Sequence, residues 1–286
     1  MLFRSDYIFA FWGKHGQNGV PAPKYYLLDR INKSDITAYI DGSEWTSTGF
    51  LDTPTQCQES LIDPRRIRGV PWINEEMYNK CTWYFKRLVM SEDLERSKIV
   101  PCYIGAIHSY FTVDENYTNI KTNDIYCSFG GNAGHITTGL RPEVYNYLNK
   151  VFEEQKLFPN VKTIIGQRFE TQDYFRTIKE SYISISAWGA GNCCRRMWEI
   201  MANEACCFVQ EPFIIYPNKF VDGESCVYYS SIDELIEKLN YYLNNKEKCI
   251  KIGKNSHNHI KRYHTGKQRV KYMLNVMSGG DWQHEY

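Results

Sequence analysis

Between residues 124 and 210 the sequence alternates regularly between short apolar runs and segments of helical periodicity. The apolar runs are DIYCSF, VKTIIG, YISISA and ACCFVQ, and the helical segments between them are RPEVYNYLNKVFEEQ, TQDYFRTIKES and residues 193–203. Nearly continuous apolar runs are typical of strands that are covered on both faces. The alternation therefore predicts a parallel sheet with helices on both sides, in which a ligand binds beyond the carboxyl ends of the strands.

Local signals mark where these elements begin. Pro142 suits the first turn of the first helix, and Thr171 is the expected N-cap of the second. After a further strand, CVYYS, Ser231 and Glu234 predict a capping box for the helix in SIDELIEKLNYYLNN. Two more helices are expected in KEKCIKIGKNSHNHIKRYH and KQRVKYMLNVM, followed by a loose tail.

The first part of the chain is less regular. DYIFAFW, ITAYI and IVPCYIGAI are read as strands, and PKYYLLDRIN and MYNKCTWYFKRLV as helices. We therefore expect a smaller α/β domain over residues 1–118, a larger one over residues 119–277 and a tail over residues 278–286.

Composition argues against several classes of function. The 286 residues carry a formal net charge of +1, which gives no overall attraction to nucleic acid or to an anionic membrane. No run of about 18 apolar residues occurs, so no transmembrane helix is expected. The ten cysteines form no C-x-x-C pair, and four of them form two adjacent doublets. We expect reduced, buried thiols without a metal site, in the cytoplasm or, for a viral chain, the host cytoplasm.

The segment RRMWEIMA places charged residues at the start of an otherwise apolar helix. Arg195, Arg196 and Glu199 have the spacing of a helical surface ion pair, which is one interpretation. They also follow the glycine-rich loop AWGAGN at the carboxyl end of a strand, where the helix dipole favours an anion. Arginine suits phosphate, and a carboxylate one turn further in can accept both hydroxyls of a ribose. We favour this second interpretation, a site for a nucleoside diphosphate and its sugar.

Two further loops, SFGGNAGHITTG and GQRFE, reach the same edge of the predicted sheet. The glycines of the first loop either allow close approach to a phosphate or form an ordinary turn. They do not match G-x-G-x-x-G, so a dinucleotide site has weak support. Arg141, further along, is either a phosphate ligand or a surface residue. The remaining candidate ligands in these loops and in AWGAGN are Gly130, Gly131, Asn132, Arg168, Gly189, Gly191 and Asn192.

Candidate catalytic groups follow the strands of the first domain. Asp41 and Glu44 come after ITAYI, where a carboxylate suits a general base, although Asp-Gly is also a common turn. His108 follows IVPCYIGAI and is a further candidate. The three histidines of HNHIKRYHT are interpreted as part of a solvated helix face and not as a metal cluster.

Residues 120–277 resemble the nucleotide-sugar glycosyltransferases of the GT-B fold, especially the CgeB-like group. The matching features are, in order, IYCSFGG, RPEV, VKTIIG, YISISAWGAGNCCRRMWEIMANEACCFVQE, KFVDGESCVYYSSIDELIEKLNYYL and RYHTGKQRVKYML. The fourth resembles the R-x-x-E-x-x-A-x-G segment of the family, with Asn203–Glu204 where the glycine is usual. Gly191 stands where the first glutamate of an E-x7-E pattern would fall, and only Glu199 matches the second. The choice between retention and inversion is therefore open.

The resemblance implies an α/β, GT-B-like fold of two Rossmann-like domains with parallel sheets, the N-terminal domain being reduced. It further implies a metal-independent hexosyl- or glycosyltransferase without a cofactor, which uses a UDP or GDP sugar as donor. Glu199 would bind the ribose, while Arg195, Arg196 and residues 130–132 would bind the diphosphate. Asp41, Glu44 or His108 would face the acceptor hydroxyl of a glycan, a protein or a lipid-linked sugar.

Three alternatives stay open at this point. One is a glycosyltransferase that modifies hydroxymethylated bases of viral DNA, which would require a basic groove. Another is a catalytically inactive nucleotide-binding module. The least favoured is an NAD-dependent oxidoreductase, because the glycine fingerprint is missing.

Overall fold

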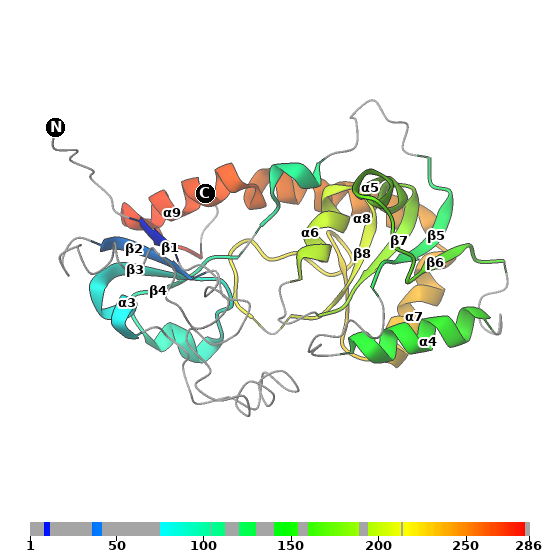
Figure 1. Cartoon of the computed structure of the whole chain (residues 1–286), viewed down its shortest axis with the longest axis horizontal. Coiled ribbons are helices and arrows are strands. Elements are labelled where there is room, and N and C mark those ends of the chain that lie inside the picture. Colours follow the sequence, from blue (N-terminus) through cyan, green and yellow to red (C-terminus); the bar gives the residue numbers. More distant parts are fainter. Residues whose placement is uncertain are drawn as a thin grey trace.

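The computed structural model describes residues 9–11, 36–41, 75–103, 105–111, 120–129, 140–153, 160–188, 194–212 and 214–283. Over these residues the chain forms two parallel sheets, one from each half of the sequence (Figure 1). None of the helices in these ranges is both long and apolar enough to cross a membrane.

The second sheet has five parallel strands in the order β6-β5-β7-β8-β9. Its strands are β5 (Asn123–Cys127), β6 (Thr163–Ile165), β7 (Ser181–Ser186), β8 (Cys206–Gln210) and β9 (Val227–Tyr229). The helices that cover it are α4 (Arg141–Glu153), α5 (Thr171–Lys179), α6 (Arg195–Ala202), α7 (Ile232–Leu243) and α8 (Lys246–His259). The predicted alternation of strands and helices is confirmed, although Glu170, and not Thr171, is the N-cap of α5.

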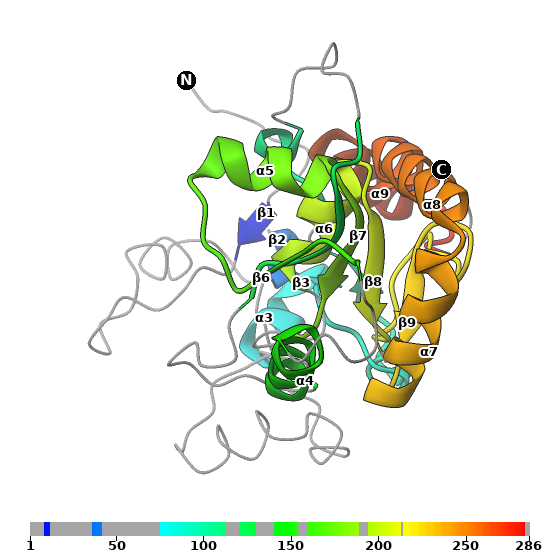
Figure 2. The same ribbon diagram turned by 90° about the vertical axis from the view of Figure 1, so that its right-hand side faces the viewer.

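Successive strand residues of this sheet enter two different cores. On one face α5 and α6 pack against residues such as Cys207, and on the other α4, α7 and α8 pack against residues such as Cys206. Figure 2 shows α5 and α4 on opposite sides of the sheet. Because side chains alternate along a strand, burial on both faces explains why the apolar runs are continuous. All cysteines in the described ranges are free, and all but Cys194 are buried.

The first sheet has four parallel strands in the order β1-β2-β3-β4. Its elements are β1 (Phe9–Phe11), β2 (Ile36–Asp41), α3 (Glu75–Lys80), β3 (Cys81–Lys86), η2 (Ser91–Glu95) and β4 (Ile99–Pro101). The prediction of one helix over MYNKCTWYFKRLV is wrong, because α3 ends at Lys80 and β3 follows. Tyr84 and Phe85 pack into the cores on opposite faces of the sheet. A short segment that is buried on both faces shows no hydrophobic periodicity, so its sequence does not distinguish a strand from a helix.

Within the described residues, two segments that join the halves lie side by side. The π-helical turn η4 (Ile260–His264) joins α8 to α9 (Gly266–Met277), which lies on the first sheet (Figure 1). Where the two segments meet, Ala106 N donates to His264 O at 2.8 Å. Gly105 has φ +73°, and a Cβ there would lie 2.4 Å from the same oxygen, so only glycine fits. The predicted domain boundary near residue 118 stays a prediction.

Two histidines of HNHIKRYHT belong to this junction. His264 is fully buried, and the ring Nε2 atoms of His259 and His264 lie 2.8 and 2.9 Å from the carbonyl oxygen of Asn218. The interpretation of this stretch as a solvated helix face is therefore wrong for them.

In the tail, Trp282 packs against the core between α9 and the first sheet, so this part of the expected loose tail is anchored.

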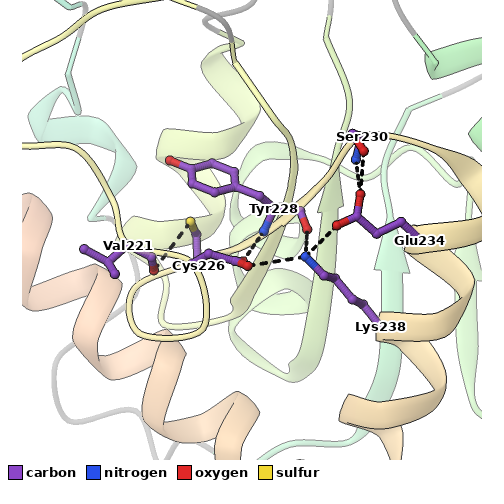
Figure 3. Close-up of polar contacts among 7 residues, drawn as sticks. Val221, Cys226, Tyr228, Ser230, Glu234 and Lys238 are labelled. Carbon is purple, nitrogen blue, oxygen red and sulfur yellow. Dashed lines mark hydrogen bonds and ion pairs between the residues drawn. The ribbon is translucent and has the colours of Figure 1, made fainter.

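The start of α7 is held by a polar network around Glu234 and Lys238 (Figure 3). Ser231 Oγ accepts from Glu234 N at 3.2 Å, which is one half of the predicted capping box. The Glu234 side chain does not return to the N-cap N–H, and its Oε2 accepts from Ser230 N at 2.7 Å instead. Lys238 Nζ lies 2.8 Å from Glu234 Oε1 and donates to Tyr228 O at 2.6 Å. Hydrogen bonds from Lys238 and Ser230 lower the pKa of Glu234 from 4.5 to about 2.

We predict that Glu234→Gln lowers the free energy of unfolding at pH 7 by about 0.5 kcal/mol, the size expected for an ion pair that stays partly accessible to water. Because the folded pKa is depressed, the carboxylate stabilises the fold above pH 4.5 and loses this effect as the pH falls toward 2. Thermal unfolding followed by circular dichroism at pH 7 and pH 3.5 should show a smaller difference between the two proteins at the lower pH. Glu237→Gln, on an exposed position of the same helix, is the control. A difference that does not change with pH would contradict the prediction.

Candidate functional site

A cavity of about 630 Å³ lies at the carboxyl ends of the strands of the second sheet. One side is formed by residues that follow β5 and β6 and by the first turns of α5 and α6. The other side is formed by Ile107, Ser109 and Tyr110, in and beside the short helix η3 (His108–Tyr110) from the first half of the chain. The cavity therefore lies at the edge of the sheet where the strand pattern predicted a ligand site, and binding of a ligand there stays a prediction.

Two arginines meet at a single aromatic ring at the edge of this cavity. The Cζ atoms of Arg141 and Arg196 lie 5.3 and 5.1 Å from the centroid of the Phe129 ring. Arg196 Nε donates to Ser128 Oγ at 2.7 Å, whereas the buried Nε of Arg141 has no hydrogen-bond partner. Burial lowers the pKa of Arg141, and the charge of Arg196 lowers it further.

The guanidinium groups of Arg141 and Arg196 have no ion-pair partner among the described residues, and the charge of Glu199 acts on Arg196 only from beyond ion-pair distance. Two buried or half-buried cations in contact with one ring repel each other, so an anion placed between them is favourable. The sequence left Arg141 undecided, and the structure brings it together with Arg196.

The first turn of α6 adds to this preference for an anion. Its N-cap, Cys194, makes no side-chain cap, and it lines the cavity together with Arg195, Arg196 and Glu199. Free backbone N–H groups and the helix dipole favour negative charge at such an end. In the same helix Met197 and Trp198 are buried, which explains the mixture of charged and apolar residues in RRMWEIMA. Neither arginine pairs with Glu199 in the described structure, so the interpretation as a surface ion pair is wrong.

Glu199 is held by residues that the sequence did not single out. Tyr174 of α5 donates its hydroxyl to Glu199 Oε2 at 2.7 Å. Burial, together with the charge of Glu199, raises the pKa of Tyr174, so this hydroxyl keeps its proton. Asn203 Nδ2 donates both to Glu199 O at 2.8 Å and to Tyr110 O at 2.9 Å, which joins α6 to η3. The only sequence signal for Tyr174 was its place in the first turn after GQRFE.

Aromatic side chains form another part of the lining. Tyr126, Phe169, Tyr174 and Phe175 all line the cavity and lie in ring contact with one another. Flat apolar surfaces of this kind suit a nucleobase. Arg168 lines the same cavity and is exposed.

The buried side chain of Gln210, at the end of β8, holds the ends of two loops. Its Oε1 accepts from Leu140 N at 3.3 Å and from Trp188 N at 3.2 Å. Trp188 Nε1 donates back to Gln210 O at 3.0 Å.

The loops themselves, residues 130–139 and 189–193, lie outside the described residues. The predicted ligands in these loops stay predictions, namely Gly130, Gly131, Asn132, Gly189, Gly191 and Asn192.

The predicted catalytic groups are not among the residues that line the cavity. Asp41 is buried at the end of β2 and accepts from the Tyr84 hydroxyl at 3.1 Å. His108 is exposed and lies between two residues that do line the cavity. Glu44 lies outside the described residues. Each of these catalytic roles stays a prediction.

Comparison with known proteins shows which family this sequence belongs to. Residues 132–275, just over half of the 286-residue chain, match the model of a family described as glycosyl transferase-like. A search of curated proteins gives no match. The CgeB-like subtype stays a prediction.

Solved structures show the same fold at low sequence identity. HepE of Anabaena, crystallised with UDP and glucose, has a TM-score of 0.51 and 10% identity, over 92% of this chain and 83% of that one. Sucrose-phosphate synthase of Thermosynechococcus elongatus has a TM-score of 0.50 and 8% identity, over 90% and 70% of the two chains. TarM has a TM-score of 0.48 and 12% identity over 88% of this chain, which spans only 57% of TarM.

The family match covers the segment from α4 to α9, which includes most of the second parallel sheet and part of the cavity lining. The chain has a GT-B-like fold and belongs to the glycosyl transferase-like family.

Proposed function

We propose that this protein transfers a sugar from a nucleoside diphosphate to a hydroxyl acceptor, and that the cavity at α6 is the donor site. The observation that carries the proposal is the pair Arg141 and Arg196, which share the Phe129 ring without a carboxylate partner in the described structure. Arg196 lies in the first turn of α6, which has no side-chain cap, and lines the cavity together with Glu199. A nucleoside diphosphate has the matching groups, an anionic diphosphate and a neutral ribose.

The two guanidinium groups would act on the leaving group. When the bond between the sugar and the diphosphate breaks, negative charge develops on the diphosphate oxygens. Fixed donors and positive charges that already point at these oxygens stabilise the transition state without reorganising during the reaction. Arginines and a helix N-terminus can do this without a metal ion, and metal independence is part of the proposal.

Glu199 would accept hydrogen bonds from the ribose hydroxyls, and the aromatic lining would contact the base of a UDP or GDP sugar. The acceptor would enter from the side of the first half, where η3 borders the cavity. Its hydroxyl must lose a proton as the new bond forms, and Asp41, Glu44 and His108 are the proposed bases. A glycan, a protein or a lipid-linked sugar is the proposed acceptor class. Binding of the acceptor would also exclude water from the donor.

We predict that Glu199→Gln weakens binding of UDP or GDP roughly tenfold, because the amide is a weaker acceptor for ribose hydroxyls than the carboxylate. Gln keeps an oxygen for the Tyr174 hydroxyl, so the fold should be retained. Isothermal titration calorimetry measures the affinity, and circular dichroism checks the fold. Unchanged affinity in a folded variant would refute the ribose role of Glu199.

A second prediction concerns the diphosphate. Arg196→Met keeps the apolar stem but removes the charge, so affinity for UDP or GDP should fall roughly 10- to 100-fold. The preference for the nucleoside diphosphate over the monophosphate should shrink as well. Arg176→Met is the control, because this arginine lies on the exposed side of α5 in an ion pair with Asp173. Equal losses for the diphosphate and the monophosphate would contradict a role at the second phosphate.

Turnover is tested separately from binding. Release of UDP or GDP from a panel of nucleotide-sugars, with and without glycan acceptors, should be detected for the unaltered protein and be reduced in Arg196→Met. Tight nucleotide binding without turnover of any donor would instead favour an inactive nucleotide-binding module. Turnover only with hydroxymethylated DNA would move the acceptor to nucleic acid.

A further inference from the structure

The hydrogen bond between Tyr174 and Glu199 joins two helices at the wall of the cavity. Tyr174 lies on α5 and Glu199 on α6, and both line the cavity. The hydroxyl donates to Glu199 Oε2 at 2.7 Å, within the range of a charge-assisted bond. In the described structure no other side chain donates to this carboxylate.

From this contact we propose that Tyr174 is a positioning residue, which holds the Glu199 carboxylate in the orientation that receives the ribose hydroxyls of the donor. The inference rests on the proposed function, because it assumes that Glu199 accepts from ribose. The inference assigns a role to Tyr174, a residue of α5 that lines the cavity. Tyr174 does not belong to the segment RRMWEIMA, which forms α6.

The ring of Tyr174 is itself held in place. Its centroid lies 5.1 Å from that of Phe175 and 6.1 Å from that of Tyr126, in edge-to-face contacts. A glutamate side chain has three rotatable bonds, and it loses this freedom when it binds a ligand. The Tyr174 hydroxyl is already fixed by packing, and its hydrogen bond restricts the glutamate before the nucleotide binds. Part of the entropic cost of ordering the glutamate is therefore removed from the binding step. The tyrosine uses one lone pair of the carboxylate, and the remaining lone pairs of its two oxygens are left for the ribose hydroxyls.

The state of protonation supports the same role. Burial and the adjacent carboxylate raise the pKa of Tyr174, so the hydroxyl stays a neutral donor throughout the physiological range. A neutral donor orients the carboxylate and leaves its negative charge in place. A lysine or arginine at this point would neutralise the carboxylate and compete with the ribose for it.

The test compares a nucleotide that has ribose hydroxyls with one that lacks them. Tyr174→Phe removes only the hydroxyl and keeps the ring contacts, so the fold is expected to persist. The probes are UDP or GDP, whichever the unaltered protein binds more tightly, and the 2′,3′-dideoxy form of the same nucleotide. We expect Tyr174→Phe to weaken binding of the ribonucleotide roughly three- to tenfold and to change binding of the dideoxynucleotide less than about twofold.

A double-mutant cycle shows whether the tyrosine acts through the glutamate. In the Glu199→Ala background, Tyr174→Phe should cause no further loss of ribonucleotide affinity. Tyr182→Phe, at a half-buried tyrosine of β7 outside the cavity lining, is the matched control and should bind like the unaltered protein.

Several results would overturn the inference. Equal losses for the two nucleotides would indicate a general structural role, and a further loss in the Glu199→Ala background would indicate direct contact with the ligand. Unchanged ribonucleotide affinity in Tyr174→Phe, with a clear loss in Glu199→Gln, would reject the positioning role and keep the proposed donor site. Absence of nucleotide binding by the unaltered protein would reject both.

Discussion

The burial of Trp198 at the junction of the two halves is the interaction on which the rest of the arrangement depends. Its ring is fully buried and lies against Tyr103, Phe220 and His264, at centroid separations of 4.9, 5.7 and 5.2 Å. These partners come from the two described segments that join the halves and from the loop before β9. Because α6 carries Trp198, the same packing that joins the halves fixes the direction in which the helix presents Arg196 and Glu199.

Buried charge beside the first sheet is arranged differently from the charge beside the cavity. In the first half Lys86 is buried, and its Nζ is paired with Asp93, while Asp41 accepts from the Tyr84 hydroxyl. Burial lowers the pKa of Lys86 and the charge of Asp93 opposes this, so these charges are compensated within the protein. At the cavity, by contrast, the guanidinium groups of Arg141 and Arg196 meet no described carboxylate. Uncompensated buried charge is costly for stability, and a ligand of opposite charge can offset that cost.

Several features of the fold and the site followed from local patterns. The strand and helix alternation predicted the second sheet, because strands buried on both faces must read as continuous apolar runs. The same reasoning failed for β3, where Tyr84 and Phe85 are also buried on both sides but the flanking residues continue a helical pattern. His259 and His264 were misread because their partner, Asn218, is about 40 residues away in the chain. Tyr174 was not found because its contact with Glu199 spans two helices.

The sequence by itself determined the elements of the second sheet, and it predicted the carboxyl edge at which the cavity lies. It also determined that α6 begins with two arginines and places a glutamate one turn later, since helical periodicity is a property of neighbouring residues. Only the tertiary structure decided which charges remain uncompensated, because Arg141 and Arg196 meet at Phe129 through contacts between separate elements. It likewise decided that Tyr174 and Gln210 support the site. Hydrogen bonds between residues distant in the chain depend on packing, and no local pattern encodes that packing.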